Sequence, residues 1–319
     1  METLRGKQKP GEGPDLGLGR EDDVVARENG SDDAEAAVFA GAGASRAVID
    51  VTKHEGLVCL PGFPFEVRTS ASTREQAGRL ADRCGRAYSY LGELLAFRPR
   101  CALVVLSRAD WSERASNPSY LMPYYDRGNL FLTGEPSDLT AWLEEAAVSA
   151  PAAAARELGQ VYGTGAGSLA PFADMLVVHE LAHAFHAGVP FVFPRSWLTE
   201  LFADMALYAF VAAQEPGRRL HLETLPRVAL EHGLLKPVAR DLRYFEAFYP
   251  YIEPLTYVWY QFRFTMMARD LIDAAGPGVL RRLWDAFALS DEQLAGVLGG
   301  RVHPAAGQWL ASWDEPQRR

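Results

Sequence analysis

The sequence lacks the features that would direct it to a membrane or out of the cell. Residues 1–20 have no apolar core of roughly 7–15 residues, as a signal peptide would, and no later stretch approaches about 18 uncharged apolar residues. The cysteines Cys59, Cys84 and Cys101 form no CxxC pair, which is typical of reduced thiols in a cytosolic protein. We therefore expect a soluble, cytoplasmic protein whose cysteines bind no metal.

Basic clusters are also missing. The formal net charge is -9, of which residues 1–35 contribute -5 through ten acidic and five basic residues. No run of Lys and Arg is interleaved with aromatic residues, so neither a nucleic-acid partner nor a membrane partner is expected. The glycine-rich segment 162–167 lacks the GxGxxG and GxxxxGK[ST] spacings of phosphate-binding loops.

The chain divides into three parts by composition. Residues 1–46 are rich in Gly, Ala, Asp and Glu and almost devoid of aromatic or β-branched residues, which predicts a disordered acidic tail. Residues 47–170 hold β-prone runs and two helical segments, which predicts an N-terminal α/β lobe. The strands are expected at 65–68, 102–106 and 129–133, and the helices at 73–96 and 138–158.

Residues 171–319 show helical periodicity almost throughout and form the predicted C-terminal lobe. Helices are expected at about 171–187, 196–213, 222–234, 238–247, 254–275, 277–288 and 291–298. We therefore predict an α+β fold, with a small mixed sheet and helices in the N-terminal lobe and a mostly helical C-terminal lobe.

The pattern His-Glu-Leu-Ala-His occupies residues 179–183, inside a predicted helix. Positions four apart in a helix lie about 6 Å apart along its axis and on one side of it, so His179 and His183 can bind one zinc ion. Glu180 then lies beside the metal, where it can take a proton from a water molecule as general base. A chain of this composition is expected to contain such a pattern by chance in roughly one case in a hundred.

Two acidic residues in the next predicted helix strengthen this interpretation. Glu200 and Asp204 lie four positions apart, so they share one face of the helix 196–213. Since His, His and Glu form one of the known ligand sets of catalytic zinc, we predict that Glu200 is the third ligand. Asp204 is expected to orient a ligand histidine. The alternative for Glu200 and Asp204 is that they lie on a solvent-exposed face of the helix and bind no metal.

His186 lies on the same face as the paired histidines but about 10 Å along the axis from His179, too far for the same ion. It is expected to support the site or the local structure. It also stands where the metzincin pattern HExxHxxGxxH requires glycine, and no histidine follows at the required place. Glu200 therefore remains the expected third ligand.

These motifs resemble those of the gluzincin metallopeptidases, the group of thermolysin and aminopeptidase N, and within it the shorter bacterial peptidase MA-like domains. The resemblance covers roughly residues 60–315 and is carried by HELAH at 179–183, TELFAD at 199–204 and NLFLT at 129–133. It implies a zincin-like active-site helix between the two lobes. No GAMEN-like signature precedes that helix, and the interval from His183 to Glu200 is shorter than in thermolysin, so nothing indicates an exopeptidase.

The resemblance also implies roles for individual residues. His179, His183 and Glu200 would bind one zinc ion, Glu180 would act as base and then as acid, and Asp204 would bond a ligand histidine.

Two further family features concern the substrate. An extended peptide would pair with an edge strand, here residues 129–133. Family members usually add a Tyr or His that stabilises the oxyanion, and Tyr257 and Tyr260 are the candidates. The sequence does not choose between them, and ordinary core packing is the alternative for each.

The leading hypothesis is therefore hydrolysis of a peptide or protein substrate by a zinc metallopeptidase. One alternative is a zinc hydrolase that acts on a non-peptide amide, and a second is a non-catalytic descendant that keeps the metal as a binding module. A third is a scaffold protein in which HELAH is accidental. The sequence indicates neither the cleavage specificity nor the oligomeric state.

Overall fold

The strands form one five-stranded mixed sheet in the N-terminal half of the chain. The computed structural model describes residues 48–116, 122–165, 167–286 and 291–314. The sheet order is β1-β2-β3-β5-β4, in which β2, β3 and β5 run parallel and the two outer strands run antiparallel to their neighbours. The strands are β1 (Val58–Cys59), β2 (Glu66–Thr69), β3 (Ala102–Leu106), β4 (Tyr124–Asp126) and β5 (Asn129–Thr133).

The central strand β3 is buried along its whole length, as its unbroken apolar sequence requires. Successive side chains of a strand point to opposite faces. Leu103 and Val105 accordingly belong to the main core, whereas Val104 and Leu106 pack with Trp111 in a smaller cluster. The sheet therefore packs against a large apolar core on one face and a small apolar cluster on the other.

The prediction that residues 129–133 form an edge strand of the sheet is wrong. Residues 129–133 form β5, which lies between β3 and β4, so the edge on this side of the sheet is β4. The connecting turn explains the difference, because Arg127 and Gly128 both have positive φ, at 41° and 78°. A two-residue turn of that kind folds one strand back against the next as a hairpin.

The helices follow most of the predicted segments. Three differences have local causes: Pro151 divides 138–158 into two helices, Asp241 caps a helix that begins only at Leu242, and a last helix begins at Pro304. The helices are α2 (Arg74–Leu94), α3 (Arg108–Arg114), α4 (Asp138–Val148), α5 (Ala152–Tyr162), α6 (Ala170–Ala173), α7 (Leu176–Ala187), α8 (Ser196–Gln214), α9 (Arg219–Glu231), α10 (Leu242–Phe248), α11 (Pro254–Ala275), α12 (Gly278–Asp285), α13 (Asp291–Val297) and α14 (Pro304–Asp314).

The fold is α+β, as predicted. The described residues, from 48 onward, belong to one compact unit that contains both predicted lobes, whereas the predicted tail at 1–46 lies outside the described residues. Among the described residues, no helix is both long enough and apolar enough to span a membrane.

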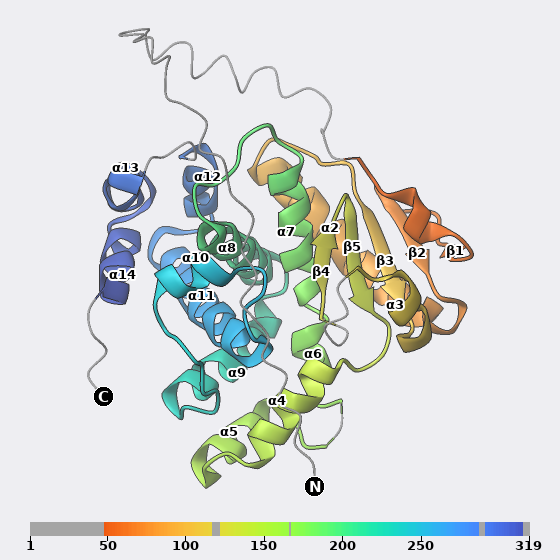
Figure 1. Ribbon diagram of the computed structural model, residues 1–319, viewed down its shortest axis with the longest axis horizontal. Coiled ribbons are helices and arrows are strands. Elements are labelled where there is room, and N and C mark those ends of the chain that lie inside the picture. The colour runs from red at the N-terminus through yellow and green to blue at the C-terminus, as the bar shows by residue number, and fades with distance from the viewer. Residues whose placement is uncertain (1–47, 117–121, 166, 287–290, 315–319) are drawn as a thin grey trace, which may run out of the picture. The chain divides into compact units, whose positions relative to one another are not determined.

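Helix α7 lies between the sheet and the helical part of this unit (Figure 1). It contacts α2, β4 and β5 on one side and α8 on the other. Phe185 anchors the sheet side, with its ring 6.0 Å from Tyr88 and 6.2 Å from Phe97. Helix α8 is in turn covered by α11, so the residues of α7 that face α8 lie deep in the protein.

Candidate metal centre

The two histidines of HELAH come together on α7. Their Nε2 atoms lie 3.2 Å apart, and their side chains are 8% and 14% exposed for His179 and His183. Four-residue spacing on a helix produces this arrangement without help from the rest of the fold. Two ring nitrogens thus face one small volume.

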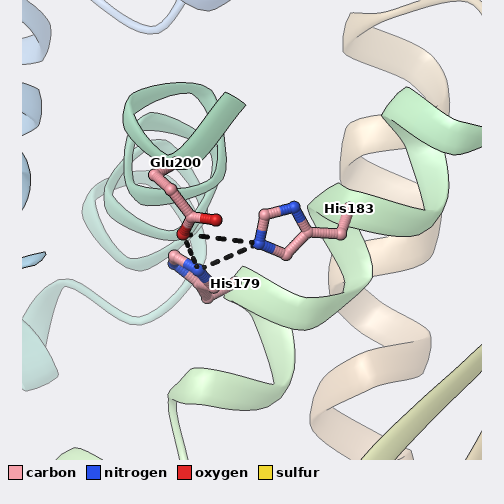
Figure 2. Close-up of side chains that lie close together, drawn as sticks. All are labelled: His179, His183 and Glu200. Carbon is pink, nitrogen blue, oxygen red and sulfur yellow. Dashed lines mark hydrogen bonds and ion pairs between the residues drawn. The ribbon is translucent and has the colours of Figure 1, made fainter. Parts of the chain in front are cut away.

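Glu200 joins the histidines from the neighbouring helix α8. Its Oε2 atom lies 3.3 Å from Nε2 of His179 and 3.7 Å from Nε2 of His183. Figure 2 shows the carboxylate and both rings pointing toward one another. Within the described residues, these three side chains are the set of His, Cys, Asp and Glu whose ligand atoms could hold a metal ion.

The spacing of the three atoms fits a zinc ion. Ligand atoms placed tetrahedrally at about 2.0–2.1 Å from zinc are separated from one another by about 3.3–3.4 Å. The observed separations of 3.2, 3.3 and 3.7 Å bracket that value. Two imidazoles and one carboxylate are also a donor set that zinc accepts.

The charges of the cluster are coupled, because Glu200 and His179 stabilise one another's ionised forms. Burial disfavours an ionised Glu200, but His183 and His179 outweigh this effect and hold the pKa of Glu200 well below its usual value. Burial likewise opposes a charged His179, yet Asp204 and Glu200 raise the pKa of its imidazole well above the usual range. A metal ion would therefore meet an ionised carboxylate and displace a proton from the histidine.

Glu180 follows His179 directly and is buried. Burial raises the pKa of its carboxyl group, despite the opposing effect of His179 and His183. A carboxyl group with a raised pKa can both accept and return a proton near neutral pH. The buried position of Glu180 therefore favours the protonated form of its carboxyl group more than water would.

A cavity of about 70 Å³ adjoins this group. Its polar wall includes His179, Glu180 and Tyr257, and its remaining walls are largely apolar. Leu139 and Leu143 of α4 and Phe172 of α6 supply part of the apolar surface. The cavity therefore offers an apolar space directly beside the polar cluster.

Asp204 lies one turn after Glu200 on α8. Its Oδ1 atom is 3.6 Å from Nδ1 of His179 and accepts a hydrogen bond of 3.0 Å from the hydroxyl of Thr265. Contact with Asp204 occupies the Nδ1 side of the ring and leaves Nε2 for the cluster. Asp204 therefore lies beside His179, one of the two histidines predicted to bind zinc.

Of the two candidate tyrosines, one lies at the cluster. The hydroxyl of Tyr257 donates to Oε2 of Glu200 at 2.9 Å. Tyr260 is directed elsewhere, because its hydroxyl donates to the carbonyl of Asp241 at 2.7 Å and its ring stacks on Trp313. The expectation of a site role for Tyr260 is therefore wrong, and core packing explains this residue.

His186 has a local structural role. Its Nε2 accepts a hydrogen bond of 3.1 Å from the backbone N–H of Phe193, and the two rings stack with centroids 4.7 Å apart. Burial lowers the pKa of His186 to about 4, which keeps the ring neutral and able to accept that bond. His186 thus fixes the loop between α7 and α8 rather than joining the three candidate ligands.

Sequence reasoning missed two other contacts of Glu200. The hydroxyl of Tyr249 donates to Oε1 at 2.8 Å, and Nε2 of Gln261 donates to Oε2 at 2.6 Å. Gln261 follows Tyr257 by four residues, and this spacing was a usable signal. Tyr249 stands between α10 and α11, and no local pattern connects it with the site.

Comparison with protein-family models finds no match, and comparison with curated protein sequences finds none. The functional argument therefore depends on the motifs and on the geometry of this chain.

Proposed function

We propose that this protein is a zinc-dependent metallopeptidase of the gluzincin type, which hydrolyses peptide bonds with Glu180 as general base. The convergence of His179, His183 and Glu200 from two helices carries the proposal, because their spacing suits one zinc ion. The resemblance of HELAH and TELFAD to the gluzincin motifs supports the same conclusion.

The proposed chemistry assigns one task to each group. His179, His183 and Glu200 would hold the ion, and bound zinc would supply Lewis acidity that polarises a carbonyl group and acidifies water. Glu180 takes the proton of the attacking water and later gives it to the leaving amine. Tyr257 is the candidate donor to the oxyanion, a role in which its hydroxyl would leave the hydrogen bond to Oε2 of Glu200 that it makes before substrate binds.

The substrate proposed is a peptide or protein segment in extended form. Strand β4, whose three residues are half-buried, is the outer strand of the sheet on the side of α7, and an extended chain can add to such an edge. The apolar cavity beside Glu180 suits an apolar side chain next to the scissile bond. The proposal includes a cytoplasmic location, supported by the unpaired state of Cys59, Cys84 and Cys101.

Metal analysis combined with a peptide-library assay tests the proposal. The purified full chain is expected to contain about one zinc ion and to cleave peptide bonds in the library. A chelator is expected to abolish the cleavage and added zinc to restore it. A chain that contains zinc but cleaves no peptide would instead favour a non-peptide amide substrate or a binding role, and a chain that binds no zinc would contradict the metal site.

A further inference from the structure

Helix α11 presents three polar side chains at four-residue intervals toward α8. Tyr257, Gln261 and Thr265 lie on one face of α11, because residues four and eight apart on a helix share a side. Each of them donates a hydrogen bond to a carboxylate of α8. We call Tyr257, Gln261 and Thr265 the α11 stripe.

The acceptors on α8 have the same four-residue spacing. Glu200 accepts from Tyr257 at 2.9 Å and from Gln261 at 2.6 Å, and Asp204 accepts from Thr265 at 3.0 Å. Two helices thus face each other with matched rows, one of donors and one of acceptors. The histidines of α7 form a third row with this spacing.

The tyrosine that precedes α11 completes the contacts of Glu200. Tyr249 donates to Oε1, whereas Tyr257 and Gln261 donate to Oε2. Donors on both oxygens fix the rotation of the carboxylate about its last bond. The position of Oε2 relative to the histidines is therefore set by α11 and Tyr249 as well as by α8.

Burial makes these contacts important. Glu200 is 0% exposed and Asp204 is 3% exposed. An ionised carboxylate is strongly disfavoured in a buried position unless it accepts hydrogen bonds. The donors are neutral groups, which stabilise the charge of Glu200 without cancelling its attraction for a cation.

We propose that Tyr249 and the α11 stripe are positioning residues that hold Glu200 and Asp204 in the ligand arrangement before a metal ion binds. This inference depends on the proposed metal site but not on the peptidase reaction. Groups that orient metal ligands in this way typically contribute about 10- to 100-fold to metal affinity. The proposal assigns that contribution to a helix that carries none of the three candidate ligands.

Two isosteric substitutions test the stripe. Gln261→Met and Thr265→Val remove a donor while keeping the approximate volume of the side chain. Tyr260→Phe is the matched control for metal affinity, because Tyr260 is a buried residue of α11 whose hydroxyl bonds the backbone of Asp241 instead. Thr265→Ser retains the hydroxyl and serves as the conservative rescue.

The readouts are the zinc Kd of the metal-free full chain, measured by competition with a chelator, and the visible spectrum of the cobalt(II)-loaded chain. Gln261→Met and Thr265→Val are expected to raise the Kd by about 10- to 100-fold and to alter the cobalt spectrum. Thr265→Ser and Tyr260→Phe should keep the wild-type Kd and spectrum. Thermal unfolding of the metal-free variants identifies those that retain the fold.

The outcomes separate the inference from the proposed function. If folded Gln261→Met and Thr265→Val bind zinc within twofold of Tyr260→Phe and give the wild-type cobalt spectrum, the positioning role is overturned and the metal site stands. If Gln261→Met does not fold, Thr265→Val is judged alone. Zinc binding within twofold of Tyr260→Phe and a wild-type cobalt spectrum for Thr265→Val then overturn the role of Thr265. A wild-type chain that binds neither metal overturns the metal site together with the inference.

Discussion

Oδ1 of Asp204 lies 3.6 Å from Nδ1 of His179, while Nε2 of the same ring lies 3.3 Å from Glu200. The two nitrogens of one imidazole therefore have different partners, an orienting acid on one side and the ligand cluster on the other. This division is common for histidines that bind metal, because the acid fixes the orientation of the ring.

Asp204→Asn tests that relationship. The substitution keeps the side-chain volume but removes the charge that faces His179, so zinc affinity is expected to fall by about 10- to 100-fold. The zinc Kd of the metal-free chain is the measurement. Asp270→Asn, at an exposed position of α11, is the control and should leave the Kd unchanged. An unchanged Kd for Asp204→Asn would contradict the orienting role.

A substitution of Phe185 tests whether this side chain anchors α7 to the sheet side of the fold. Phe185→Ala removes a fully buried ring that contacts Tyr88 and Phe97. The expected loss is about 3–5 kcal/mol in the free energy of unfolding, measured by chemical denaturation. Val192→Ala, at a side chain that is 74% exposed, should change it by less than about 0.5 kcal/mol. Equal effects of the two substitutions would disprove the anchoring role.

The close approach of β5 to the start of α2 predicts a second effect on stability. A Cβ atom added at Gly134 would lie 2.3 Å from the side chain of Thr73, whereas one at Gly78 would meet nothing within 4 Å. Gly134→Ala is therefore expected to destabilise the fold by about 1–3 kcal/mol. Gly78→Ala, inside α2, should be neutral or stabilise it by up to about 1 kcal/mol. Thermal unfolding of both variants decides whether this packing is correct.

The ion pair that joins α2 to the end of α8 predicts a dependence of stability on pH. Burial raises the pKa of Glu215, but hydrogen bonds from Arg83 and Arg86 outweigh this effect and lower the pKa overall. A lowered pKa means that the stabilisation is complete above the unfolded-state pKa of about 4.5 and is lost as the pH falls through the folded-state value.

Glu215→Gln should therefore reduce the free energy of unfolding by about 1–3 kcal/mol at neutral pH and by less in acid. Denaturation of the wild type and the variant across the acid range measures the difference. A difference that stays constant with pH would show that the charge of Glu215 does not stabilise the fold.

The parts of the site that the sequence predicted depend on spacing within one helix. His179 and His183, like Glu200 and Asp204, lie four residues apart, and helix geometry alone brings such pairs to one face. Glu200 could be matched with the histidines because its helix follows theirs closely in sequence. These predictions needed no knowledge of how other elements pack.

The parts that failed depend on contacts between distant segments. Tyr257 and Tyr260 are three residues apart on α11, and which of them meets Glu200 is decided by the rotation of α11 against α8. The order of the strands also depends on how segments meet, since β4 pairs with β5 because of the turn at Arg127 and Gly128. Periodicity identifies helices and strands but does not determine which faces or edges meet.

Glu180→Gln tests the central claim most directly, because it removes the proton-transfer group while keeping the size of the side chain and all three candidate ligands. The measurement is the cleavage rate of a peptide substrate by a chain whose zinc content is determined in the same preparation. The account predicts a rate at least about 100-fold below that of the wild type, with zinc content unchanged. A zinc-loaded Glu180→Gln chain that cleaves within a few-fold of the wild-type rate would contradict it.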